Sequence, residues 1–262
     1  MADDFDGKVV VVTGATSGIG FATALAFAEK GARLILSGRA SLDPIVSRCR
    51  TLGAEAFGLS GDLAKAELSR SIIEEAISRF GTVDILINNA GFGTSGGVET
   101  VKEEQLRAVW DVNFLGAFRM SRLAIPIMRE HGGGAILFTT ALAGMYGMAN
   151  ALAYSTSKAA VINLCKAMAM EVSRDGINCN CVSPGPVDTP MLQEAIDAYG
   201  LSREDFQAVS PTGRIATAQD VAHALLFLSS GAARSINGHV LVVDNGMYAG
   251  MFTPSPACGG AS

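Results

Sequence analysis

The strongest constraint on the fold is the regular alternation of short β-branched runs with longer segments that carry apolar residues at helical spacing. Strands are expected over 8–13, 33–37, 54–59, 84–87, 135–139, 177–182 and 239–243, and helices over 19–30, 42–52, 64–80, 103–128, 151–174 and 218–229. Strands that alternate with helices in this way predict a seven-stranded parallel sheet, right-handed crossovers and helices on both faces.

Nothing in this run of elements marks a domain boundary. The chain has 262 residues, 49% of them hydrophobic and 17% charged, which is enough apolar surface to bury a sheet on both faces. We therefore expect one doubly wound α/β domain over residues 1–262. The segment 190–213 interrupts the rhythm and predicts one or two short helices that cover the carboxyl ends of the strands. The small-residue tail over 254–262 is expected to be flexible.

Charge and residue usage argue against several functions. The net charge is −5 and the basic residues are dispersed, which argues against nucleic acid as a partner. The acidic N-terminus and the absence of a run near the roughly 18 apolar residues of a membrane span predict a cytoplasmic protein outside the membrane. The five cysteines lack disulfide spacing and the three histidines lack ligand spacing, so we expect reduced thiols and no metal.

A glycine-rich segment, TGATSGIG over 13–20, connects the first strand to the first helix. Its spacing differs from the common G-x-G-x-x-G, but glycines still let backbone approach a pyrophosphate, and the helix N-terminus still offers free N–H groups and partial positive charge. A tight turn alone would also use glycine. Its place between strand and helix favours a dinucleotide site that includes Gly14, Thr16, Ser17, Gly18, Ile19 and Gly20.

Polar and small residues follow two further strands at the same predicted edge. Asp62 and Leu63 follow the third strand, where a carboxylate can accept from an adenine amino group. Asn89, Ala90 and Gly91 follow the fourth, where a small-residue backbone can pass close to a cofactor. Such residues also simply form turns. Their shared edge supports the dinucleotide interpretation.

The end of the second strand bears on the choice of cofactor. An acidic residue there would bind a ribose 2'-hydroxyl, whereas a basic one would accommodate a 2'-phosphate. The sequence has Ser37 and Arg39 and no carboxylate before Asp43, which favours NADP(H). NAD(H) stays possible if Arg39 stacks on adenine or faces water.

Tyr154 and Lys158 lie four residues apart at the start of a predicted helix and therefore share one face. Interconversion of a carbonyl and an alcohol needs a group that donates and accepts a proton at the reacting oxygen. A free tyrosine has a pKa near 10, so a cationic neighbour such as Lys158 is expected to favour the phenolate. The alternative to this catalytic interpretation is a tyrosine that only packs at the start of the helix, beside a lysine in solvent.

The TGATSGIG, NNAG and YSTSK motifs together resemble the short-chain dehydrogenase/reductase family, over about 7–246. The resemblance implies a Rossmann-type fold, a nicotinamide cofactor, a small-molecule alcohol or ketone substrate, and a homotetramer or dimer. It also implies that the Asn113 backbone carbonyl holds a water linking Lys158 to solvent. Pro184, Gly185, Val187 and Thr189 match the segment beside the nicotinamide, with the Val187 backbone and Thr189 hydroxyl near its carboxamide.

The chain departs from the family pattern at one catalytic position. The family places a serine thirteen residues before the tyrosine, where this chain has Ala141. Loss of such a donor typically costs about 2.7 to 4 kcal/mol in the transition state, so impaired turnover is expected. Intact Tyr154, Lys158 and Asn113 favour an engineered serine-to-alanine change. The alternatives are a natural enzyme that uses Thr140 or a substrate hydroxyl, and a non-catalytic dinucleotide-sensing protein.

The expected substrate pocket is largely apolar. Methionine-rich walls adapt to irregular shapes, although such residues often only pack. We expect wall positions at Phe92, Gly93, Thr94, Ala143, Met145, Tyr146, Met148, Leu152, Pro186, Met191 and Leu192. The helices over 103–128 and 151–174 carry apolar residues on more than one side, which predicts oligomerisation through them.

Overall fold

The computed structural model describes residues 5–250. Its seven strands form one parallel sheet in the order β3-β2-β1-β4-β5-β6-β7, which confirms the predicted doubly wound, Rossmann-type architecture. The strands are β1 (Val9–Thr13), β2 (Arg33–Gly38), β3 (Ala56–Ser60), β4 (Ile85–Asn88), β5 (Gly134–Thr139), β6 (Ile177–Pro184) and β7 (Val240–Val243). The predicted tail over 254–262 and Cys258 lie outside the described residues.

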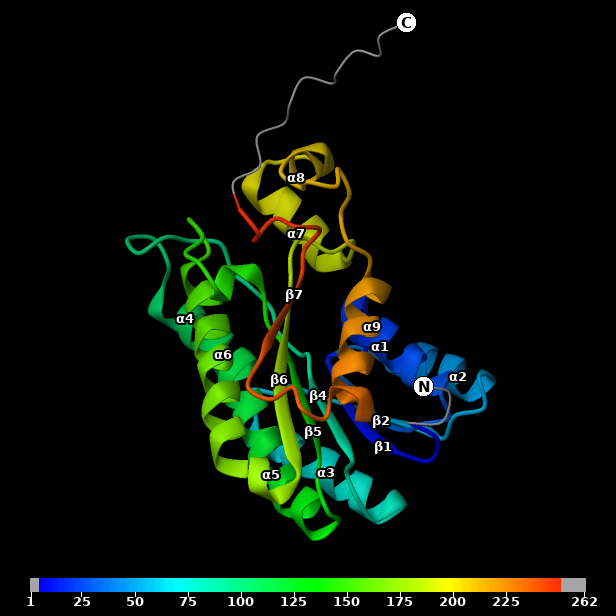
Figure 1. Cartoon of the computed structure of the whole chain (residues 1–262). Helices are drawn as coiled ribbons and strands as arrows, with labels where there is room; N and C mark the ends of the chain where they lie inside the picture. The colour runs from blue at the N-terminus through cyan, green and yellow to red at the C-terminus, as the bar shows by residue number, and fades with distance from the viewer. Residues whose placement is uncertain (1–4, 251–262) are drawn as a thin grey trace, which may run out of the picture.

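Helices cover both faces of the sheet, as Figure 1 shows. On one face lie α1 (Gly18–Ala28), α2 (Asp43–Thr51) and α9 (Ala218–Ser229); on the other lie α3 (Ala66–Phe80), α4 (Glu103–Trp110), α5 (Ala117–Glu130) and α6 (Leu152–Val172). Successive β1 residues divide between the two hydrophobic cores, Val10 and Val12 facing one and Val9 and Val11 the other. Burial on both faces explains why β1 is a continuous apolar run.

The segment 190–213 contains two short helices, α7 (Pro190–Tyr199) and α8 (Arg203–Ala208). Figure 1 shows both beyond the carboxyl ends of the strands. Arg203 of α8 donates two hydrogen bonds, of 2.9 and 2.6 Å, to the Asp188 carboxylate, and thereby ties the segment to the loop after β6. No helix within residues 5–250 is long and apolar enough to cross a membrane.

The prediction of a single helix over 103–128 is wrong in one respect. A π-helical segment, Asp111–Gly116, separates α4 from α5. Asn113 lies in this segment, and its side chain hydrogen-bonds with Phe92 and Ser157. Periodicity in the sequence does not reveal one wider turn inside a long helix, and such turns are frequent at functional sites.

Candidate active site

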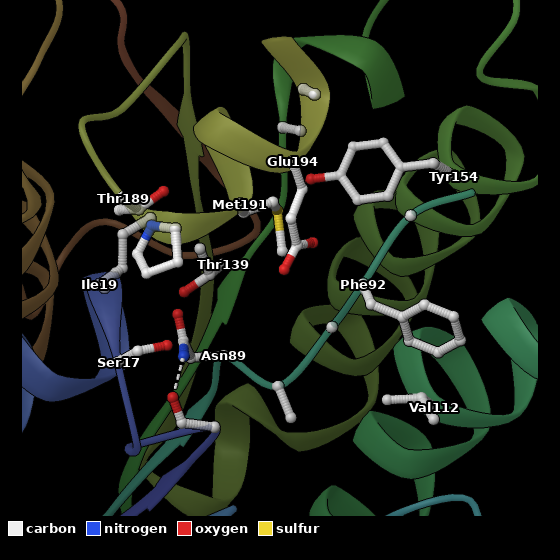
Figure 2. A pocket seen from close by; sticks show the side chains of 18 of the residues that line it. Ser17, Ile19, Asn89, Phe92, Val112, Thr139, Tyr154, Thr189, Met191 and Glu194 are labelled. Atoms are coloured by element: carbon white, nitrogen blue, oxygen red, sulfur yellow. Dashed lines mark hydrogen bonds between the residues drawn. The ribbon is translucent and has the colours of Figure 1, made fainter. Parts of the chain in front are cut away.

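A cavity of about 490 Å³ opens at the carboxyl edge of the sheet. The ends of β1 to β6, the N-terminal ends of α1 and α6, and helix α7 all contribute to its wall. Figure 2 shows side chains from these distant segments converging on one space. This is the edge at which open α/β sheets bind ligands.

The glycine turn after β1 fits tightly against the end of β4. Gly14 has a φ of +68°, and a Cβ there would come within 2.8 Å of the Ala90 Cα. A Cβ at Gly20 would come within 2.1 Å of the Gly14 carbonyl oxygen, so any larger residue would push the turn open. The Asn89 amide donates to the carbonyls of Thr13 and Gly14, each at 3.1 Å. The turn is therefore a rigid cradle.

The N-terminus of α1 faces this cradle. Ser17 is the N-cap residue and has extended backbone, but its side chain does not cap the helix. Ser17, Gly18 and Ile19 line the cavity, whereas Gly20 lies behind the turn. Uncapped N–H groups and the helix dipole suit an anionic group such as a diphosphate.

One end of the cavity is formed by the ends of β2 and β3, with Ser37, Arg39, Asp62 and Leu63 on its wall. The exposed Arg39 guanidinium carbon lies 5.7 Å from the centre of the Phe92 ring. Asp62 accepts from the Ala64 backbone N–H at 3.0 Å and so also forms a local turn. Arg39 is the basic group that this end offers to a ligand.

Tyr154 and Lys158 both line the cavity from the first turns of α6. The Lys158 ammonium donates to the Thr139 carbonyl oxygen at 2.8 Å and lies 5.6 Å from the centre of the Tyr154 ring. Burial raises the pKa of Tyr154 to about 12 and lowers the pKa of Lys158 to about 8. Burial is the main cause of the raised pKa of Tyr154 in the protein alone, and the expectation that Lys158, together with the positive ring of an oxidised nicotinamide, favours the phenolate stays a prediction.

Asn113 does not line the cavity but supports its wall. Its Oδ1 accepts from the Phe92 N–H at 3.0 Å, and its Nδ2 donates to the Phe92 carbonyl at 2.9 Å and to the Ser157 hydroxyl at 3.0 Å. A Cβ at Gly91 would lie within 3.1 Å of both Asn113 Oδ1 and Lys158 Nζ, so glycine allows this close arrangement. Asn113 thus joins the π segment, the loop after β4 and α6.

Ala141 lines the cavity directly after β5, in extended backbone. Thr140 also lines the cavity, and its hydroxyl donates to the Val182 carbonyl of β6 at 3.1 Å. Thr139 also lines the cavity, and its buried hydroxyl has no hydrogen-bond partner within residues 5–250. The sequence reasoning missed Thr139, although alternation along a strand places it on the same side as Ala141.

The expected substrate residues divide into two groups. Phe92, Gly93, Thr94, Met148, Pro186, Met191 and Leu192 line the cavity, whereas Ala143, Met145, Tyr146 and Leu152 do not. Met145 packs against the hydrophobic core, and Tyr146 stacks on Tyr248 with ring centres 6.2 Å apart. Met145 therefore belongs to the core, and Tyr146 is 44% exposed outside the cavity. Positions that the sequence reasoning missed include Val112 and, from α7, Glu194, Ala195, Ala198 and Tyr199.

The remaining expected residues of the dinucleotide site lie together. Among them, Asn89, Ala90 and Gly91 come from the end of β4, and Pro184, Gly185, Val187 and Thr189 from the end of β6 and the loop after it. The Thr189 hydroxyl donates to the Val187 carbonyl at 3.1 Å. The rigid glycine cradle, the uncapped helix and the unpartnered Thr139 hydroxyl fit a phosphate-bearing dinucleotide.

Comparison with known proteins agrees with this geometry. Residues 14–248 match the family model described as "Enoyl-(Acyl carrier protein) reductase". The chain is 32% identical over 244 residues to the 3-oxoacyl-(acyl-carrier-protein) reductase of Thermotoga maritima, covering 92% of this chain and 98% of that protein. It is 34% identical over 247 residues to the cyclohexanol dehydrogenase of an Acinetobacter species, covering 93% and 96%.

A solved structure gives the same result at the level of the fold. The crystal structure of levodione reductase superposes with a TM-score of 0.90 at 30% sequence identity, covering 94% of this chain and 99% of that one. The shared sheet, the matched sequence and the residues at the carboxyl edge lead to one conclusion. The chain belongs to the short-chain dehydrogenase/reductase family of oxidoreductases.

Proposed function

We propose that this protein interconverts a secondary alcohol and a ketone with NAD(P)(H), and that Tyr154 is the general acid/base. The observation that carries the proposal is the shared cavity: the half-buried Tyr154 and the buried Lys158 line the same space as the glycine cradle. Cyclohexanol dehydrogenase and the ketoacyl reductase among the relatives support this reaction class.

In this proposal the glycine cradle and the N-terminus of α1 hold the diphosphate. The strand ends of β4 and β6 hold the nicotinamide half, with the Val187 backbone and the Thr189 hydroxyl near the carboxamide. The bound nicotinamide supplies or takes up the hydride. We further assign the unpartnered Thr139 hydroxyl to a polar atom of the nicotinamide half, because a buried hydroxyl without a partner destabilises the protein until a ligand satisfies it.

Tyr154 donates its proton to the oxygen of a ketone during reduction and takes a proton from the alcohol during oxidation. Its pKa of about 12 keeps the phenol protonated at neutral pH, so the protein alone is set to act as an acid. Lys158 supplies positive charge near the phenol and is held by the Thr139 carbonyl. The Asn113 carbonyl is proposed to hold the water that connects Lys158 to solvent.

Ala141 is proposed to lower the rate of this chain. A serine hydroxyl here would donate to the substrate oxygen, and its loss removes one hydrogen bond from the transition state. Thr140 is engaged with Val182, so no neighbouring threonine replaces that donor. An engineered serine-to-alanine change remains our favoured explanation.

The preferred cofactor is proposed to be NADP(H). Arg39 is exposed at the end of β2, where a 2'-phosphate would lie, and a guanidinium group can bind a phosphate through two parallel N–H groups. NAD(H) is the alternative if Arg39 only stacks on adenine. We also propose a cytoplasmic homotetramer, or a dimer, in which Phe118 of α5 and Met170 of α6, 38% and 86% exposed, are covered by another copy.

The reaction is tested by mixing the protein with NADPH and a panel of cyclic and linear ketones, and following the absorbance of the reduced nicotinamide. Slow turnover that Tyr154→Phe abolishes supports the proposal, provided that the variant still binds NADPH. The second candidate function is a non-catalytic dinucleotide sensor, which Ala141 favours. It predicts dinucleotide binding without turnover, even after serine is restored at position 141.

A further inference from the structure

Helix α7 places one acidic side chain, Glu194, on the wall of the cavity. Figure 2 shows its side chain extending from α7 past the Tyr154 hydroxyl, so that the carboxylate lies beside the end of Met191. The other lining residues from the same helix are apolar or small, apart from Tyr199, whose hydroxyl donates to the Asn150 carbonyl at 3.2 Å. Glu194 is therefore the charged group that α7 presents to a ligand.

No side chain within residues 5–250 forms an ion pair or a hydrogen bond with the Glu194 carboxylate. Arg39 and Lys158 are the cationic side chains that line the same cavity, and neither forms an ion pair with Glu194. Arg203 binds the Asp188 carboxylate, and the buried Lys158 ammonium donates to the Thr139 carbonyl. The negative charge on α7 is thus available to a bound molecule.

We infer that Glu194 selects substrates that carry a cationic or hydrogen-bond-donating group away from the reacting carbonyl. This inference rests on the proposed function. A carboxylate accepts hydrogen bonds only, and its bonds to ammonium or hydroxyl groups are stronger than those between neutral partners. The same carboxylate repels a substrate that bears its own carboxylate. The substrate class is therefore an amino or hydroxy ketone, or the corresponding alcohol, and not a keto acid.

We assign Glu194 to substrate selection and Tyr154 to proton transfer. Glu194 lies on the helix that covers the strand ends, whereas Tyr154 and Lys158 extend from α6. Its carboxylate is exposed, so each contact with a substrate is partly screened by solvent. An effect of about tenfold in kcat/KM is expected, which corresponds to about 1.4 kcal/mol.

The test uses three cyclohexanones that differ only at the 4-position, with an amino, a methyl or a carboxylate substituent. The parent is the Ala141→Ser protein, so that turnover is measurable. In Glu194→Gln, the ratio of kcat/KM for the amino ketone to that for the methyl ketone should fall about tenfold. The ratio for the carboxylate ketone to the methyl ketone should rise by a similar factor.

Asp197→Asn is the matched control, because Asp197 carries the same charge on the same helix but does not line the cavity. It should leave both ratios within twofold of the parent. Unchanged ratios in Glu194→Gln would overturn the inference, as would equal changes in both variants, which would point to the overall charge of α7. If the parent binds NADPH but reduces none of the three ketones, the proposed function itself fails, and this inference with it.

Discussion

The Lys158 ammonium donates a 2.8 Å hydrogen bond to the carbonyl oxygen of Thr139, at the last residue of β5. This contact joins α6 to the centre of the sheet. Thr139 thus binds Lys158 through its backbone and lines the cavity, while its buried hydroxyl has no hydrogen-bond partner within residues 5–250. Lys158 and Thr139 each have a testable consequence.

The buried Lys158 should make stability depend on pH. Its pKa falls from 10.5 in the unfolded chain to about 8 in the folded one, so the unfolded state binds more protons between these values. Burial of the Lys158 ammonium lowers the free energy of unfolding by its full amount below pH 8. This cost disappears as the pH rises toward 10.5. Between pH 7 and 10, the protein should gain about 2.5 kcal/mol in free energy of unfolding relative to its Lys158→Met variant.

Urea titrations of the two proteins at each pH measure this difference. The comparison removes the contributions of all other groups that titrate in both proteins. Parallel stability curves for wild type and Lys158→Met would show that the ammonium is not desolvated in the folded state.

Thr139→Val should weaken NADPH binding about tenfold, because the hydroxyl that we assign to the nicotinamide half is lost. Thr139→Ser keeps the hydroxyl and should bind close to wild type. The dissociation constant of NADPH is measured by quenching of protein fluorescence. 2'-Phospho-ADP-ribose lacks the nicotinamide, and its affinity should not change; an equal loss for both ligands would instead indicate damage to the cradle.

Ala141→Ser should raise kcat by about two to three orders of magnitude, because it restores one donor to the oxygen on which charge develops. The dissociation constant of NADPH should stay within twofold, since the added hydroxyl faces the substrate. Stopped-flow single-turnover kinetics separate the chemical step from product release. An unchanged chemical rate would refute the impairment, and the complete absence of turnover would favour the dinucleotide sensor.

Arg39→Leu should raise the dissociation constant of NADPH at least tenfold and change that of NADH little, because only NADPH has the 2'-phosphate that Arg39 would bind. Titration calorimetry with both cofactors provides the measurement. An equal loss for NADPH and NADH would mean that Arg39 stacks on adenine. A wild-type preference for NADH would contradict the assignment outright.

Features that are local in the chain could be predicted from the sequence. Each strand and helix shows a characteristic spacing of apolar residues in the sequence, and the TGATSGIG turn lies between the first strand and the first helix. The parallel sheet and its ligand-binding edge could therefore be predicted from these local patterns. The spacing of Tyr154 and Lys158 is likewise a property of one helix, and the structure brings both into one cavity with the strand-end residues.

Features that depend on contacts between distant segments could not be predicted from the sequence. The direction of the Thr140 hydroxyl, the lack of a partner for Thr139, and the pKa of Tyr154 are set by neighbours from other strands and helices. The spacing of Tyr154 and Lys158 in the sequence suggested that Lys158 promotes ionisation of Tyr154, but the extent of burial, which raises the pKa of Tyr154, depends on the tertiary structure.

The substrate end shows the same division most clearly. The sequence does not show whether an apolar residue such as Met145 lines a pocket or packs in the core. The structure shows that Met145 packs against the core. In the sequence, Glu194 looks like an ordinary exposed helix residue. The structure places α7 across the strand ends, and the Glu194 side chain then lines the cavity. The sequence determined which chemistry is present, because motifs are local; the tertiary structure decided which groups face the ligand, because burial and direction depend on the whole chain.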